Sequence, residues 1–262
     1  MILEQLAEYA AMRVENDKAK VSLSEIKACA LAEPKGDFRF ENALKKRKGA
    51  AICEVKKASP SKGVISEDFP YLDIAREYEG VGADCISCLT EPKWFLGSDD
   101  IFREIRQNVS IPMIRKDFTV DEYQIYQAKL MGADAVLLIC SILEESRLAY
   151  YLDICNALGM SALVETHDKG EIETAIKVKS RVLGVNNRNL KDFTVNLDNA
   201  VSLREYIPSN IVYVAESGVA APSDGARLLN RGADAVLIGE ALMRTSDKGK
   251  FLREMREGII NA

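Results

Sequence analysis

The chain has 262 residues with a formal net charge of −5, and hydrophobic residues make up 47% of it. This length suffices for a sizeable core, and the acidic balance argues against wholesale nucleic-acid binding. No apolar run approaches the roughly 20 residues that span a bilayer. Glu4 and Glu8 interrupt the N-terminus where a signal peptide is uniformly apolar, so we expect a cytoplasmic protein.

The first 49 residues read as helices attached to a larger body. Apolar side chains recur at helical spacing at Ile2, Leu3, Leu6, Tyr9, Ala10 and Val14. Ser22 and Glu25 fit a capping box that opens a short helix through about Leu31. Another helical piece is indicated around Phe40.

From residue 51 onward, short β-rich runs alternate with amphipathic or capped segments. The β-rich runs are 51–56, 84–90, 111–118, 135–139, 161–166, 181–187, 210–216 and 235–239. The segments between and after them are 70–80, 99–107, 121–131, 144–157, 168–178, 196–206, 222–231 and 248–260. Most of the β-rich runs are continuously apolar, which is typical of strands buried on both faces. This pattern predicts a parallel sheet covered by helices.

An internal repeat sharpens the fold prediction. The triplet Gly-Ala-Asp stands at 82–84, 132–134 and 232–234, each time just before an apolar run. A 50-residue spacing equals two βα units, and eight such units favour a closed (βα)8 TIM barrel in the α/β class with an N-terminal helical extension. A doubly wound open sheet is the alternative, but no GxGxxG follows the first strand. We expect the barrel to comprise residues 50–262 and residues 1–49 to pack on it near its catalytic mouth, the end that carries the active site.

Six cysteines are present, and two of them form a CxxC. They are Cys29, Cys53, Cys85, Cys88, Cys140 and Cys155. A redox CxxC normally opens a helix, but Cys85 and Cys88 lie in a predicted strand and so face opposite sides. We therefore expect all six to be small core residues, and we expect no metal site.

The stretch AICEVKKASPSKG, residues 51–63, begins as an apolar strand and ends as a polar loop. Glu54 and Lys56 are two residues apart, so both side chains point to the same side of the strand. Opposite charges at the end of an apolar strand are costly unless they are paired or used. An exposed edge strand with a solvated ion pair is the structural alternative.

Charged and amide side chains also stand at the ends of other predicted strands. They are Lys116, Glu165, Asn186, Arg188 and Glu216. Active sites of (βα)8 barrels lie at the carboxyl ends of the strands, where these groups would shift one another's pKa values. The set suits proton transfer on a substrate that bears negative charge.

A second group of residues suits an anion. Ser217-Gly218 and Gly239-Glu240 follow the seventh and eighth strands, the common phosphate position of such barrels. Ser59 in the first loop would add a hydroxyl donor. Each glycine taken alone could also mark a tight turn.

Two further features leave alternatives open. His167, the single histidine, follows Glu165 and reads better as a helix-start residue than as a catalytic group. Trp94 and Phe95 either roof an aromatic substrate or pack their own loop.

Together the motifs resemble one known family. ICEVKKASPSKG, LTEPKWFLGS, IPMIRKDF, ALVETHD, GVNNRNLKDF, VAESGV and AVLIGEALM are similar to the motifs of indole-3-glycerol-phosphate synthases of tryptophan biosynthesis, over nearly the whole chain. The resemblance implies conversion of 1-(2-carboxyphenylamino)-1-deoxyribulose 5-phosphate to indole-3-glycerol phosphate, with loss of CO2 and water. It implies neither a metal nor an organic cofactor, and it leaves open association with other enzymes of the pathway.

The same resemblance implies residue roles. Lys116 matches the general acid at the substrate's ketone oxygen, and Glu165 matches the second acid/base, used in dehydration. Glu54 and Lys56 match an orienting pair, with Lys56 near the substrate's carboxylate or phosphate. Asn186 and Arg188 match ligands of the sugar hydroxyls and carboxylate, and Glu216 matches a further active-site carboxylate. The residues that match phosphate ligands are Ser59, Gly218 and Gly239, with Ser217 and Glu240 beside them.

Two other functions fit parts of the pattern. A phosphoribosyl-anthranilate isomerase, or another sugar-phosphate isomerase, needs an acid/base pair but not lysines on both the first and the third strand. A non-catalytic barrel that binds a phosphorylated ligand would not need Glu54, Lys56, Lys116, Glu165 and Asn186 together.

Overall fold

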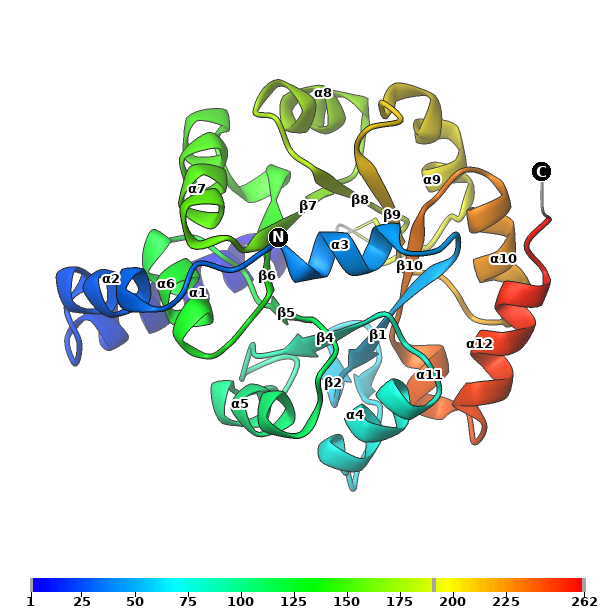
Figure 1. Ribbon diagram of the computed structural model, residues 1–262, viewed down its shortest axis with the longest axis horizontal. Coiled ribbons are helices and arrows are strands. Elements are labelled where there is room, and N and C mark those ends of the chain that lie inside the picture. The colour runs from blue at the N-terminus through cyan, green and yellow to red at the C-terminus, as the bar shows by residue number, and fades with distance from the viewer. Residues whose placement is uncertain (1, 190–191, 261–262) are drawn as a thin grey trace.

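A computed structural model describes residues 2–189 and 192–260 of the chain. Eight parallel strands close into a barrel in the order in which they occur in the chain (Figure 1). They are β1 Ala50–Val55, β4 Cys85–Leu89, β5 Met113–Lys116, β6 Ala135–Ile139, β7 Ser161–Thr166, β8 Val182–Asn186, β9 Val212–Glu216 and β10 Ala235–Ile238. This confirms the predicted (βα)8 barrel, and the open-sheet alternative is wrong.

Helices lie between the strands on the outside of the barrel (Figure 1). They are α4 Tyr71–Gly80, α5 Asp99–Asn108, α6 Glu122–Leu130, α7 Glu145–Leu158, α8 Lys169–Lys177, α9 Asp198–Leu203, α10 Pro222–Asn230 and, after the last strand, α12 Lys248–Glu257. Shorter elements that the sequence pattern did not predict are the hairpin β2 Ala58–Ser59 and β3 Gly63–Val64, the 3-10 turn η1 Cys140–Ile142 and the helix α11 Glu240–Arg244. The 3-10 turn η2 Arg204–Tyr206 lies at the end of the predicted segment 196–206.

Two apolar layers explain why the strands are continuously apolar. Side chains on the inner face, such as Ile52, Ile114 and Leu163, form the core inside the barrel. Side chains on the outer face, such as Cys53 and Val136, pack against the surrounding helices. Each strand is thus buried on both faces, as parallel strands usually are.

The Gly-Ala-Asp repeat stabilises the amino-terminal end of the barrel. Its glycines end the preceding helices with φ values of +85°, +80° and +97°, a region that favours glycine. Each aspartate Oδ2 accepts a hydrogen bond from the backbone N–H of the neighbouring strand: Asp84 from Ala51 at 2.9 Å, Asp134 from Met113 at 2.9 Å, and Asp234 from Tyr213 at 2.8 Å. The repeated aspartate therefore helps to fix the register between neighbouring strands.

The three N-terminal helices lie at different places on the barrel. They are α1 Ile2–Lys18, α2 Leu23–Ala32, which has the predicted capping box, and α3 Arg39–Lys45. Helix α2 packs beside α6. Helix α3 lies across the amino-terminal end of the barrel (Figure 1), where Phe40 and Leu44 join the inner core. The expectation that all of residues 1–49 packs near the mouth is therefore wrong for α3, and the domain boundary at residue 49 stays a prediction.

The cysteine prediction is correct in part. Cys85 and Cys88 are buried on opposite faces of β4, as expected for a strand. Cys29 is exposed and Cys140 is half-buried, so the expectation that all six are core residues is wrong for these two. No helix in the described ranges is long and apolar enough to cross a membrane.

Candidate active site

A cavity of about 840 Å³ opens at the carboxyl ends of the strands, and the structure brings all twelve predicted site residues to its wall. They are Glu54, Lys56, Ser59, Lys116, Glu165, Asn186, Arg188, Glu216, Ser217, Gly218, Gly239 and Glu240. Apolar side chains, among them Leu6, Phe95, Phe118 and Leu237, line the same cavity.

The alternation of strand side chains places the charged groups there. Ile52, Ile114 and Leu163 lie on the inner face in the core, and the next inner position of each strand, two residues on, is Glu54, Lys116 and Glu165. The inner face of the barrel thus changes from apolar to ionisable at its last layer, where the strands reach the cavity.

Lys116 stands between two carboxylates. Its Nζ lies 2.6 Å from Glu216 Oε2 and 3.3 Å from Glu165 Oε2. Burial by itself lowers the pKa of Lys116, but the charges of Glu216 and Glu165 outweigh it, and the pKa is raised above the ordinary lysine value. The lysine is therefore held protonated at neutral pH.

Glu216 occupies a space that a neighbouring glycine leaves empty. A Cβ on Gly184 of β8 would overlap Glu216 Oε1, and this oxygen is buried without a hydrogen-bond partner among the described residues. Burial raises the pKa of Glu216 to about 7, with Lys116 opposing the shift and Glu165 adding to it. The carboxyl group is consequently poised to change its protonation near neutral pH.

Glu165 contacts an amide, an imidazole and the Lys116 ammonium group. Asn186 Nδ2 donates to Glu165 Oε1 at 3.1 Å, and His167 Nε2 lies 3.4 Å from the same oxygen. Burial by itself raises the pKa of Glu165, but Lys116 and His167 outweigh it, so the pKa is lowered. Two buried carboxyl groups on either side of one lysine thus have pKa values pushed apart, which is typical of an acid–base site.

Glu54 and Lys56 form the ion pair that the strand pattern predicted. Lys56 Nζ lies 2.6 Å from Glu54 Oε1, and Ser87 Oγ donates to Glu54 Oε2 at 3.4 Å. β1 is fully buried and pairs with both β4 and β10. The alternative of an exposed edge strand is therefore wrong.

The backbone after β9 and β10 leaves little space for side chains on the cavity wall. Ser217 and Gly218 follow β9 with φ values of +65° and +92°. A Cβ on Gly239 would lie only 2.5 Å from Glu54 Oε1 and 2.8 Å from Lys56 Nζ, so this position has no room for a side chain. Glycine at 239 therefore follows from packing against the Glu54–Lys56 pair.

The hairpin after β1 brings two more predicted residues to the cavity wall. Ser59 belongs to β2, which pairs with β3, and its Oγ lies 3.5 Å from Ser61 Oγ. Lys62 Nζ lies 3.7 Å from Glu240 Oε1. The loop after β1 and the start of α11 thus lie next to each other on the cavity wall.

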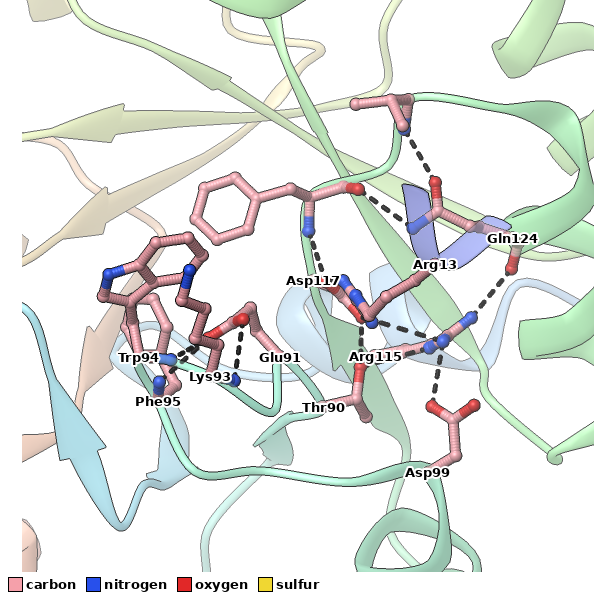
Figure 2. Close-up of polar contacts among 12 residues, drawn as sticks. Arg13, Thr90, Glu91, Lys93, Trp94, Phe95, Asp99, Arg115, Asp117 and Gln124 are labelled. Carbon is pink, nitrogen blue, oxygen red and sulfur yellow. Dashed lines mark hydrogen bonds and ion pairs between the residues drawn. The ribbon is translucent and has the colours of Figure 1, made fainter. Parts of the chain in front are cut away.

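Glu91, a residue to which the sequence analysis gave no role, fixes the loop after β4. Its carboxylate is fully buried and accepts the backbone N–H groups of Lys93, Trp94 and Phe95 at 2.7–2.9 Å (Figure 2). Phe95 consequently lines the cavity, whereas Trp94 packs edge-on against Tyr9 of α1. Trp94 thus packs against helix α1 rather than within its own loop, and a contact between Phe95 and an aromatic substrate stays a prediction.

Helix α1 is tied to the residue beside Lys116. Arg13 makes a bidentate ion pair with Asp117 at 2.7 and 3.1 Å, and Thr90 Oγ1 donates to the same carboxylate at 2.8 Å (Figure 2). Arg115, on the other side of Lys116, contacts Thr90 at 3.2 Å. Neither Arg13 nor Asp117 stood out in the sequence, because they lie 104 positions apart and only the folded chain joins them.

His167 lies one residue before the N-cap of α8, near the helix start that the sequence favoured, and it also approaches the site. Its backbone N–H donates to Glu171 Oε2 at 2.7 Å just before the N-cap residue Asp168 of α8. Its Nε2 faces Glu165. The backbone N–H of Arg188 in turn donates to Asn186 Oδ1 at 2.9 Å.

Metal ligation has no support in the described ranges. They contain no group of three or more histidine, cysteine, aspartate or glutamate side chains that could hold an ion. The chemistry on the cavity wall is that of ammonium, carboxylate and amide groups. That no cofactor takes part stays a prediction.

The fold and this wall of paired acids and bases define a (βα)8-barrel protein with a cavity of acidic and basic side chains at the carboxyl ends of its strands. The family model described as indole-3-glycerol phosphate synthase matches residues 3–255, and the chain belongs to that family. An indole-3-glycerol phosphate synthase from Ruminiclostridium cellulolyticum is 52% identical over 98% of this chain and 99% of its own, and one from Endomicrobium trichonymphae is 46% identical over 98% and 100%.

A solved structure supports the fold alone. Thiamine phosphate pyrophosphorylase from Pyrococcus furiosus superposes with a TM-score of 0.61 at 18% identity, covering 84% of this chain and 96% of its own. At this identity the likeness concerns the barrel and carries nothing about chemistry.

Proposed function

We propose that this chain closes the indole ring of 1-(2-carboxyphenylamino)-1-deoxyribulose 5-phosphate and releases CO2 and water, as its family membership supports. The observation that carries the proposal is Lys116 between Glu165 and Glu216, at the end of a cavity whose other end suits a phosphate. Ring closure needs an acid at a ketone oxygen, and dehydration needs a second acid and a base.

In the first step Lys116 is the general acid. The ring carbon that bears the carboxylate attacks the ketone carbon, and Lys116 gives its proton to the developing alkoxide. Its raised pKa keeps it charged until then, and Glu216 Oε2, 2.6 Å away, stabilises the ammonium ion. Departure of CO2 then leaves a hydroxyl group on the new ring.

In the second step the hydroxyl group leaves as water, and Glu165 acts as an acid/base group in this dehydration. Its two oxygens reach Lys116 and Asn186, so its position is fixed from both sides. Glu216 is the further carboxylate that tunes Lys116. Elimination requires a proton on the leaving hydroxyl oxygen and removal of a proton from the CH2 carbon next to the ring nitrogen, which keeps its own N–H. Once Lys116 has regained a proton, the Lys116–Glu165 pair exchanges these two protons with the intermediate.

Charged and polar groups hold the substrate. Lys56, set by Glu54, neutralises the carboxylate before it leaves, while Asn186 and Arg188 bind the sugar hydroxyls and carboxylate. Ser59, Gly218 and Gly239 hold the phosphate, with Ser217 and Glu240 beside them. Phe95 and Phe118, whose ring centroids are 6.1 Å apart, supply an apolar wall for the aromatic ring.

One fluorescence assay tests this function. Incubation of the purified chain with the carboxyphenylamino substrate should produce indole fluorescence and CO2 in equal amounts. An isomerase would instead convert phosphoribosyl anthranilate without CO2 release, and a non-catalytic barrel would bind the substrate unchanged. A cytoplasmic location and association with other enzymes of tryptophan biosynthesis are further expectations, which fractionation and co-purification would test.

A further inference from the structure

His167 lies between the buried Glu165 and the partly exposed carboxylate of Glu171. Its Nε2 is 3.4 Å from Glu165 Oε1, and its Nδ1 is 3.1 Å from Glu171 Oε2. Glu165 is 4% exposed, whereas the side chains of His167 and Glu171 are 19% and 20% exposed. The imidazole ring therefore stands between the reacting carboxyl group and solvent.

The hydrogen bonds fix which ring nitrogen faces Glu165. An ionised carboxylate only accepts hydrogen bonds, so Glu171 next to Nδ1 assigns a proton to that nitrogen. Nε2 is buried and makes no hydrogen bond within the part of the chain that the structure describes. It therefore offers Glu165 a lone pair when the ring is neutral and an N–H donor when the ring is charged.

The groups around the ring favour its charged form. Glu165 on β7, Glu171 on α8 and Glu216 on β9 outweigh the effect of burial, so the pKa of His167 is raised. Cys140 of η1 contacts Glu171 O at 3.8 Å, and Asn199 of α9 donates to the His167 carbonyl at 3.3 Å. Lys116 lies on the other oxygen of Glu165, away from the ring.

The proposed reaction needs such a route. The substrate's carboxylate leaves as neutral CO2, so each turnover consumes one proton, which must reach a buried site from solvent. We propose that His167 delivers this proton to Glu165, with Glu171 as the positioning residue that fixes the imidazole tautomer. The Nε2–H bond breaks and an O–H bond forms at Glu165 Oε1, which leaves a neutral ring protonated at Nδ1. Between turnovers a hydronium ion returns a proton to Nε2 when the ring, whose side chain is 19% exposed, rotates toward solvent. This inference rests on the proposed function.

His167→Ala tests the route. We expect kcat to fall by about 10²-fold, as for a lost acid–base group, with KM little changed because the ring is not assigned to substrate. Added imidazole should restore kcat in proportion to its protonated fraction. Glu171→Gln should displace the pH dependence of kcat without making the enzyme responsive to imidazole, because the ring of His167 is still present.

A matched variant separates this from a structural role at the start of α8. Asp168→Ala removes the cap that accepts the Glu171 N–H at 3.0 Å, so it should lower the Tm while leaving kcat unresponsive to imidazole. If folded His167→Ala keeps the wild-type kcat and pH profile, or if its loss ignores imidazole as that of Asp168→Ala does, the relay is wrong. Wild-type enzyme without indole formation would instead refute the proposed function itself.

Discussion

Gly184 and Glu216 share one space inside the barrel: a Cβ on Gly184 would overlap Glu216 Oε1. Gly184 sits at an inner position of β8, two residues before Asn186. Leu163 bounds the same space, because the added Cβ would lie 3.2 Å from its Cδ1. The place of the Glu216 carboxylate, and with it the 2.6 Å contact to Lys116, therefore depends on the absence of a side chain at 184.

Gly184→Ala should consequently impair activity more than folding. The methyl group pushes the Glu216 carboxylate away from Lys116, and a displacement of about 1 Å at a reacting group can reduce kcat by about 10²-fold. The measurement is kcat from indole fluorescence, beside the Tm. Gly80→Ala is the matched control, because a Cβ there meets nothing within 4 Å. Equal kcat values for the two variants would contradict the steric argument.

Lys116→Met separates chemistry from binding. Methionine keeps the apolar stem and removes the ammonium group, so we expect a fall in kcat on the order of 10²–10⁴ with the barrel intact. Ser59→Ala should instead raise KM with a small effect on kcat, because one hydrogen bond to a charged group contributes about 1.5–3 kcal/mol. A folded Lys116→Met enzyme with near-normal kcat would show that another residue is the acid.

The raised pKa of Glu216 should make stability depend on pH. The folded protein keeps a proton on Glu216 up to about pH 7, whereas the unfolded chain loses it near the ordinary value of 4.5. The contribution of this group to stability is therefore full below about pH 4.5 and is lost as the pH rises through about 7. Within this window the loss is at most about 1.4 kcal/mol per pH unit.

Urea unfolding of wild type and Glu216→Gln between about pH 5 and about pH 8 measures this effect. Glutamine imitates the protonated carboxyl group, so the difference in unfolding free energy between the two proteins should change with pH in the direction given. Glu257→Gln, at an exposed position of α12, is the control and should follow the wild type. Parallel curves for wild type and Glu216→Gln would place the pKa of Glu216 near its ordinary value.

Local sequence was enough to predict what alternation along a strand dictates. Continuously apolar runs located the eight strands, and on β1, β5 and β7 the first ionisable residue of the inner face (Glu54, Lys116 or Glu165) falls where the strand reaches the cavity. The Gly-Ala-Asp repeat predicted strand starts, although its hydrogen bonds between neighbouring strands became visible only in the structure.

Features that depend on contacts between distant residues could not be predicted in this way. Gly184 looked like any glycine in a strand until Glu216 was found beside it. Helix α3 carries Phe40 on one apolar face, and a face alone does not tell which end of the barrel it covers. Arg13 reads as an ordinary exposed position of a helix until Asp117 approaches it.

Arg13→Met tests the link between α1 and the residue beside Lys116. Asp117 is buried, and its pKa is lowered because Arg13 and Arg115 outweigh the effect of burial. Removing the Arg13 guanidinium deprives this carboxylate of two hydrogen bonds, which should reduce the unfolding free energy by about 1.5–3 kcal/mol. KM should rise as well, because Leu6 of the loosened helix lines the cavity.

Lys18→Met provides the comparison for Arg13→Met, because it removes another ion pair of α1, that with Asp121 at 2.8 Å. Its partners are more exposed, with 25% and 30% of their side chains accessible, so the loss should stay below about 1 kcal/mol. In an Arg13→Met background, Asp117→Asn should destabilise less than it does alone, since the two residues act as a pair. Additive losses in this double-mutant cycle, with KM unchanged in Arg13→Met, would show that α1 is held by its apolar contacts instead.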